Sequence, residues 1–491
     1  MTTPAPAEIA RRPSAFSAVR WILATSFVTR LLGLAGLAAV ARLVSEDGFG
    51  AYRALASLHL VGLAVLPLGF DQLVVREASR RRAYAQGLVG ALVAMAVACG
   101  AVVLLAHPLL AEIMGLAGER ATLLWFVPLV LAIQALKTAI KPVLAAELAF
   151  RRIGFGEFLQ TLTLWFGGLG LLAVLPETWA LYVAFAAAEA IEAWFLWRGR
   201  WKSWGAVLAR PRQTARRFRA LLRRHRRFCG VLAADQGLNI ASAQAPALLL
   251  GGLIGPAAVA AFSSSNFLIT LPLLLLVGAL GRVVFPSLSG LSEDDLRARV
   301  YQALRGSAAF IAPFLIWLAL FSATIVRAVL GPEWAEAAAP LVPWLAMYLL
   351  FVGVFSPISS LDVLRDRPEV GLFWNIAAVV LRAGAIVLGA RWGVEGAIAA
   401  FAVVSAALWM VHGALMGWLL GEGQARFHAA WLRYVPLWMA VGGAWWATRW
   451  LAGEGWLALA LSPVAAAGYF GALWLLDRET AGLGLRLLRR K

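Results

Sequence analysis

The sequence predicts an all-α, polytopic membrane protein with about 14 transmembrane helices. We expect two pseudo-symmetric six-helix lobes followed by two C-terminal helices. Three observations lead to this prediction. The 491 residues are 62% hydrophobic and only 14% charged. Apolar stretches long enough to cross a bilayer recur along the whole chain, and basic residues gather at every second connection between them.

A transmembrane helix needs about 20 apolar residues, because each residue adds 1.5 Å to a helix that must cross about 30 Å of hydrocarbon. Fourteen stretches of the sequence meet this requirement. In chain order they are 19–43, 50–70, 85–106, 121–146, 156–175, 179–197, 230–253, 258–285, 304–329, 338–361, 370–390, 395–419, 432–451 and 456–476.

The basic residues predict the orientation of these spans. Twelve of the thirty residues from Arg198 to Arg227 are Arg or Lys and none is acidic, which is typical of a cytoplasmic connection. With the N-terminus inside, 34 of the 44 basic residues fall on the cytoplasmic side, six outside and four within spans. We therefore expect both termini in the cytoplasm. The net charge of +18 indicates topology, and a nucleic-acid partner is not expected.

The chain also contains an internal repeat. The segment Arg42–Tyr52 aligns with Gly252–Phe262 at an offset of 210 residues, and both are expected to be short outer turns. Because each repeat has an even number of spans, the two lobes should have the same orientation, as in transporters that bind substrate between parallel repeats. The expected parts are an N-lobe with spans 1–6 at 1–200, a basic cytoplasmic loop at 198–228, a C-lobe with spans 7–12 at 229–430, and spans 13 and 14 with a basic cytoplasmic tail at 431–491.

Four basic side chains fall inside expected spans. They are Arg30 in span 1, Lys137 and Lys141 in span 4, and Arg382 in span 11. A charge at mid-bilayer costs at least about 2.5 kcal/mol, so it usually faces a cavity or a partner. We expect these four residues to bind substrate. The alternatives are that Lys141 extends towards the cytoplasm and that Arg382 pairs structurally with a polar neighbour.

Acidic and polar residues of the spans complete the candidate site. Asp235 and Asn239 are four residues apart near the start of span 7, which makes them the candidate ion-coupling site. Glu189 and Glu192, near the end of span 6, are expected to face cytoplasmic water or nearby arginines. His59 in span 2 is expected to be a packing residue. Four basic residues within spans against one deep acid make the expected cavity positive. Such a cavity is suited to an anion such as phosphate or diphosphate.

Several functional classes lack support in the sequence. No lysine stands in a Gly-x-x-x-x-Gly-Lys motif, so nucleotide hydrolysis is not expected. Cys99 and Cys229 predict neither a disulfide framework nor a metal site, and we expect no cofactor. The first apolar run is too long for a cleaved signal peptide and contains Arg30. Short outer connections argue against a membrane enzyme.

Three stretches carry a resemblance to a known family. The first runs through the N-terminal part and includes Arg30-Leu-Leu-Gly-Leu, Ala41–Tyr52 and Val74–Arg80. The second is Leu330–Ala337, and the third is Arg391–Ala397. Together they resemble the Wzx-type polysaccharide and O-antigen flippases of the multidrug/oligosaccharidyl-lipid/polysaccharide (MOP) exporter superfamily. The resemblance implies two six-helix lobes in a V shape, a central cationic cavity and alternating access. In related lipid II flippases, basic residues of the first helix line the cavity, and Arg30 matches that position.

The resemblance also implies a function and partners. The substrate would be an undecaprenyl-diphosphate-linked oligosaccharide, moved across the bacterial cytoplasmic (inner) membrane for polysaccharide biosynthesis. The implied partners are membrane lipids, a coupling proton or sodium ion, and a polysaccharide polymerase complex. The alternatives are a lipid II flippase or drug/cation antiporter of the same superfamily, a membrane glycosyltransferase or polymerase, and a structural component of a polysaccharide assembly complex.

Overall fold

The computed structural model describes residues 15–76, 81–147, 149–200, 210–270, 273, 292–359, 361–365, 367–453 and 455–482. Within these ranges the chain is almost entirely helical and contains no strand. Four features of the sequence lie outside the described residues. They are Arg11 and Arg12, residues 201–209 of the basic strip, half of the eighth expected span (271–272 and 274–285), and the basic tail after residue 482.

The chain forms two compact units, which are described separately. The first unit comprises Met1–Val40, Leu55–Glu112 and Leu116–Ile240, and the second comprises Ala41–Ala54, Ile113–Gly115 and Ala241–Lys491. The boundaries between units therefore fall inside four helices, α2 (Ala15–Leu43), α3 (Glu46–Val65), α6 (His107–Ile113) and α12 (Pro211–Leu253).

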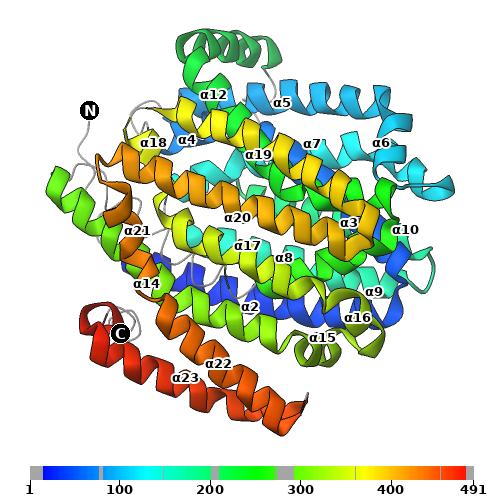
Figure 1. Ribbon diagram of the computed structural model, residues 1–491. Helices are drawn as coiled ribbons and strands as arrows, with labels where there is room; N and C mark the ends of the chain where they lie inside the picture. Colours follow the sequence, from blue (N-terminus) through cyan, green and yellow to red (C-terminus); the bar gives the residue numbers. More distant parts are fainter. Residues whose placement is uncertain are drawn as a thin grey trace. The chain divides into compact units, whose positions relative to one another are not determined.

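In the first unit, α7 is the central helix, and both α5 and α10 pack against it. Helix α8 packs on α10, and the short helix α4 contacts α5 and α7 (Figure 1). The elements are α4 (Phe70–Arg76), α5 (Arg81–Leu105), α6 (His107–Ile113), the 3₁₀ helix η2 (Gly118–Phe126), α7 (Val127–Ala146), α8 (Phe150–Leu162), the π-helical turn η3 (Thr163–Gly167), α9 (Gly168–Leu171) and α10 (Glu177–Trp197).

In the second unit, α17 packs against both α14 and α20, and α19 lies along α20. Helices α22 and α23 pair with each other, and α22 packs on α14 (Figure 1). Residues 256–270 are helical as well. The elements are α14 (Glu293–Leu320), α15 (Ser322–Leu330), α16 (Pro332–Ala338), α17 (Leu341–Phe355), η4 (Ser356–Ile358), α18 (Leu361–Leu364), α19 (Pro368–Gly389), η5 (Ala390–Trp392), α20 (Gly393–Leu419), α21 (Gln424–Leu432), α22 (Val435–Ala452) and α23 (Trp456–Leu476).

The helices confirm the predicted all-α fold of a multi-pass membrane protein. Among the described residues, nine helical stretches are long and apolar enough to cross a bilayer. One of them, Glu369–Leu419, joins α19 and α20 through the turn η5. Large apolar side chains on these helices are exposed, for example Val97 at 68% and Leu475 at 75%, as expected for surfaces that face lipid. The count of fourteen spans stays a prediction.

The fifth and ninth expected spans are not uniform α-helices, and the basic strip, expected to be a loop, is largely helical where the structure describes it. The fifth span is divided into α8, η3 and α9, and the ninth is interrupted at Phe321 between α14 and α15. The basic strip is helical from Pro211 onward as part of α12, which is kinked at His225. Arg, Ala and Leu are among the strongest helix formers, so this polar strip has no reason to stay extended.

A turn that carries the family resemblance is anchored within the second unit. The Trp334 indole N–H donates to the Ala41 carbonyl oxygen at 2.7 Å, and the Ala257 N–H donates to the Asp47 carboxylate at 3.2 Å. Gly50 lies directly against the backbone of Pro256, where a Cβ atom would meet the carbonyl oxygen at 1.8 Å. The two turns that the 210-residue offset aligns are therefore in contact with each other.

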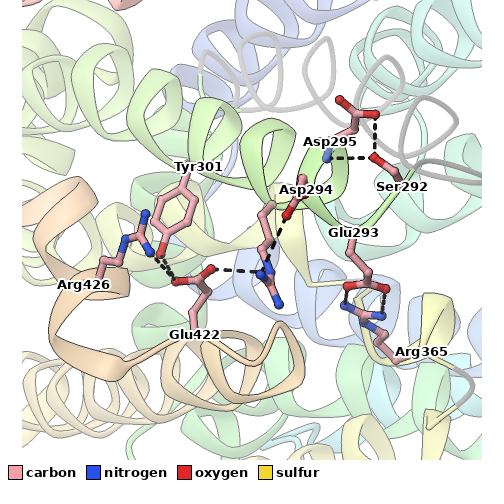
Figure 2. Close-up of polar contacts among 9 residues, drawn as sticks. Ser292, Glu293, Asp294, Asp295, Tyr301, Arg365, Glu422 and Arg426 are labelled. Carbon is pink, nitrogen blue, oxygen red and sulfur yellow. Dashed lines mark hydrogen bonds and ion pairs between the residues drawn. The ribbon is translucent and has the colours of Figure 1, made fainter.

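The start of α14 shows how local sequence sets a helix end in this fold. Ser292 accepts a hydrogen bond from the Asp295 N–H at 3.3 Å, and its hydroxyl donates to the Asp295 carboxylate at 2.6 Å (Figure 2). Three acidic residues, Glu293, Asp294 and Asp295, form the first turn, where negative charge is favoured by the helix dipole.

Reporter fusions test the orientation of the chain. A reporter fused after Arg212 should read cytoplasmic and one fused after Pro332 should read periplasmic, because basic residues near helix ends are retained inside. The measurement is paired alkaline phosphatase and fluorescent-protein activity in intact cells. Equal readings at both positions would contradict the alternating topology.

Candidate functional site

Two of the predicted basic residues meet a set of buried acids within the first unit. The Lys137 ammonium pairs with Glu189 and lies 3.1 Å from the Glu192 carboxylate. The Lys141 ammonium lies 2.6 Å from Glu192 and 3.4 Å from Glu157. We call these five residues the lysine–glutamate cluster. Lys137 is 6% exposed, Glu189 2% and Glu192 0%, so the centre of the cluster is buried.

Helical spacing explains why these side chains converge. Lys137 and Lys141 are four residues apart on α7, and Glu189 and Glu192 are three apart on α10, so each pair lies on one helix face. The two faces meet where α7 packs against α10. Helix α8 adds Glu157 to the cluster, and the Gln160 amide on the same helix donates to Glu189 at 2.6 Å.

Two expectations were wrong at this point. Glu189 and Glu192 do not face water or arginines, because they are buried against lysines. The expected positive charge is also not found around the two lysines, since Lys137 and Lys141 meet three carboxylates. A buried ammonium loses its hydration and needs anionic partners, which the neighbouring helices provide. Lys141 pairs with these acids, and its side chain is 29% exposed.

A second buried polar pair lies in the same unit. His59 is 0% exposed, and its Nε2 atom is 2.9 Å from the Tyr182 hydroxyl. Gln134 is 2% exposed on α7, one helical turn before Lys137. His59 packs against the rings of Tyr182 and Phe185, as expected for a packing histidine.

Arg382 is enclosed in the second unit. It is 2% exposed, and one of its terminal N–H groups donates to the Ser242 hydroxyl at 2.8 Å. The guanidinium carbon lies 5.6 to 5.9 Å from the ring centres of Tyr348, Trp374 and Phe401, within the range of cation–π attraction. Its Nε and Nη2 atoms have no hydrogen-bond partner among the described residues.

Other buried polar groups lie in the same unit as Arg382. The His412 ring lies 4.5 Å from the ring of Trp374, which also contacts Arg382. Within the described part of the chain, both ring nitrogens of His412 and the hydroxyls of Ser263 and Ser405 have no hydrogen-bond partner. Buried polar groups are normally bonded to protein or water, so these positions are suited to water or a small polar ligand.

The remaining predicted residues lie in the first unit. Arg30 is half-buried on α2, Asp235 is half-buried on α12, and Asn239 is exposed one turn further along α12. The structure thus brings Lys137 and Lys141 together, whereas Arg382 belongs to the other unit with its own neighbours.

The sequence reasoning missed Glu157 and the role of Glu189 and Glu192. The sequence did contain a signal for these partners, because Glu189 and Glu192 lie on one face of the expected span 179–197. Buried lysines require compensation, so every acid within a span should be considered as their partner. Among the described residues there is no group of three or more His, Cys, Asp or Glu side chains that could hold a metal ion.

Comparisons with known proteins agree with this architecture. The profile of the family described as "Polysaccharide biosynthesis protein" matches residues 39–339. The lipopolysaccharide biosynthesis protein WzxC of Escherichia coli (strain K12) is 23% identical over 393 residues, which cover 77% of this chain and 76% of WzxC.

Two solved structures show the same fold. The lipid II flippase MurJ in an inward closed conformation has a TM-score of 0.65 at 13% identity, covering 92% of this chain and 99% of MurJ. An inward-facing multidrug resistance MATE transporter of the MOP superfamily has a TM-score of 0.52 at 14% identity, covering 83% of this chain and 94% of that transporter. At these identities the two structures establish the fold alone.

Proposed function

Because the chain belongs to the polysaccharide biosynthesis protein family, we propose that it is a flippase for undecaprenyl-diphosphate-linked oligosaccharide. It would carry this lipid from the inner to the outer leaflet of the cytoplasmic membrane. The fold supports a transport function, since a lipid II flippase and a drug transporter share it. Both termini would lie in the cytoplasm.

The lysine–glutamate cluster is the observation that supports this proposal most. A diphosphate that leaves water for a low-dielectric interior needs positive partners to offset its lost hydration. Lys137 and Lys141 supply two ammonium groups on one face of α7. In the structure their partners are carboxylates, whose oxygen atoms resemble phosphate oxygens as acceptors. We propose that Glu189 and Glu192 occupy the lysines until the diphosphate replaces them.

This exchange has an electrostatic consequence. Once displaced, Glu189 and Glu192 would lie close to a diphosphate, and like charges at short range disfavour ionisation of one partner. Uptake of a proton by either carboxylate relieves the repulsion. We therefore propose a proton as the coupling ion at this cluster, with Asp235 and Asn239 on α12 as a further candidate ion-coupling pair. Arg30 and Arg382 remain proposed substrate-binding residues.

The alternatives are separated by different observations. A lipid II flippase needs the same diphosphate contacts, so the lysine–glutamate cluster supports both flippase functions equally. A drug/cation antiporter is expected to have more acids than bases in its cavity, and the lysine–glutamate cluster, with three acids and two lysines, does not argue against one. The argument for a polysaccharide precursor therefore rests on the family match.

Substitution of Arg30 tests the proposal. Arg30→Ala should abolish glycan export while the protein level in the membrane stays normal, because a half-buried side chain contributes little packing. Arg30→Lys should restore export in part, since a single ammonium cannot make the two parallel hydrogen bonds that a guanidinium makes to phosphate. The measurement is surface polysaccharide in a strain that lacks the chromosomal copy.

The matched control is Arg391→Ala, which removes an exposed arginine from η5 and should leave export unchanged. Normal export by Arg30→Ala would remove Arg30 from the site. Poor membrane insertion of Arg30→Ala would instead assign it a structural role.

A further inference from the structure

A second set of arginines surrounds a cavity in the second unit. The cavity has a volume of about 510 Å³ and lies among α14, α21 and the segment that follows α23. Arg305, Arg426 and Arg433 line it, together with a single acid, Glu479. Tyr301 and Thr480 add hydroxyl groups to the lining. The three guanidinium groups carry donors suited to an anion with several oxygen atoms, whereas the Tyr301 hydroxyl already donates to Glu422 and the Thr480 hydroxyl is hydrogen-bonded to Tyr434.

The cavity lies at one boundary of three expected spans. Arg305 is at the beginning of the span 304–329, and Arg433 is at the beginning of the span 432–451. Glu479 follows the end of the span 456–476 by three residues. All three positions are on the side that the charge distribution predicts to be cytoplasmic, at the depth where lipid headgroups lie.

The acid that pairs with Arg426 also has other partners, so it neutralises that arginine only in part. The Glu422 carboxylate lies 3.7 Å from Arg426, but it also lies 3.5 Å from Arg297 and accepts the Tyr301 hydroxyl at 3.1 Å (Figure 2). One carboxylate therefore serves two arginines. The Nε atom of Arg305 is buried and has no hydrogen-bond partner among the described residues.

The Asp477 carboxylate lies 3.7 Å from Arg433. It also accepts the Tyr434 hydroxyl at 2.7 Å and the Thr480 N–H at 3.0 Å. Burial alone would raise the pKa of Asp477, but these hydrogen bonds and Arg433 outweigh burial and lower it. Asp477 is thus ionised at neutral pH and is held in place by the backbone after α23.

We propose that this cavity binds the phosphate headgroup of an anionic phospholipid from the cytoplasmic leaflet. Arg305, Arg426 and Arg433 would surround the phosphate, and the acyl chains would extend into the bilayer beside the adjoining spans. Basic pockets between helices on the cytoplasmic side are suited to such headgroups. The proposal does not depend on the identity of the transported substrate.

Lipid binding to the purified full-length chain tests this proposal. The protein is placed in phosphatidylcholine nanodiscs with increasing fractions of phosphatidylglycerol, and bound lipid is counted by native mass spectrometry. The unchanged protein should retain phosphatidylglycerol in preference to phosphatidylcholine. Arg305→Gln and Arg433→Gln should each weaken this retention roughly fivefold, and the double variant more, since each basic residue near a membrane surface contributes about that factor.

Two control variants fix the interpretation. Arg299→Gln removes an exposed arginine of the same helix that does not line the cavity, and it should leave retention unchanged. Glu479→Gln removes the one acid of the lining, is exposed and should strengthen retention. Melting curves in pure phosphatidylcholine establish that each variant is folded.

Three results would overturn the proposal. The first is equal retention of phosphatidylglycerol by the double variant and the unchanged protein. The second is weaker retention by Glu479→Gln. The third is full displacement of the lipid by millimolar inorganic phosphate, which would identify a site for a soluble anion.

Discussion

Lys137→Ala is expected to abolish transport and to destabilise the folded protein by about 3–5 kcal/mol, the usual cost of breaking a buried ion pair. The substitution removes the ammonium that lies between Glu189 and Glu192 and leaves two buried carboxylates beside each other. Lys141→Ala should destabilise the protein less, because the Lys141 side chain is 29% exposed, water can hydrate its partner Glu157, and Glu192 keeps Lys137 as a partner. Thermal melting of the purified variants in detergent measures the difference.

A second-site change separates loss of charge balance from loss of packing. Glu189→Gln in the Lys137→Ala background removes the carboxylate that has lost its ammonium partner, since Glu192 still pairs with Lys141, and it should restore much of the lost stability. Lys137→Arg keeps the charge and should stay folded. If Lys137→Ala melts like the unchanged protein, the lysine does not stabilise the two glutamates and the described ion pairs are not present in the membrane.

Gly50→Ala should prevent accumulation of folded protein. The new methyl group would lie 1.8 Å from the Pro256 carbonyl oxygen, and backbone cannot move aside as a side chain can. Overpacking of this kind costs about 1–3 kcal/mol and often more. It would also separate the turn at Ala41–Ala54 from residues near Ala257, to which Asp47 is bonded. Fluorescence-detected size-exclusion chromatography of a tagged variant measures the folded fraction.

The matched control is Gly443→Ala in α22, another helical glycine with open space around its Cα. There the same change should stabilise the helix by about 0.5–1 kcal/mol, because alanine is the better helix former. Normal accumulation of Gly50→Ala would show that the two turns are not in close contact.

The sequence was sufficient to predict the membrane helices, because their signal is local. About 20 apolar residues between polar connections define a span wherever its neighbours lie. The interruption at Phe321 and the π-helical turn after Leu162 were not predicted, because no proline stands at either position to mark it in the sequence. The offset of 210 residues aligned two turns as equivalent parts of a repeat, which stays a prediction, and it did not predict that the two turns touch, with Gly50 against Pro256.

The site was predictable only in part. Lys137 and Lys141 were identified because an ammonium inside a span requires an explanation. Their partners on α8 and α10 were not, because helix spacing gives the face of one helix and not which helix it meets. The same limit applies to Arg382, whose aromatic neighbours Tyr348 and Phe401 come from two other helices.

The most direct test of the proposed substrate contact is transport by the double variant Lys137→Met/Glu189→Gln. It removes one positive and one negative charge together, so the net charge of the lysine–glutamate cluster is unchanged. Replacing a buried ion pair with neutral groups of similar size is often tolerated, and the variant should stay folded. Reconstituted into liposomes with undecaprenyl-diphosphate-linked oligosaccharide, it should fail to move the lipid between leaflets. Flipping at the rate of the unchanged protein would contradict diphosphate binding by Lys137.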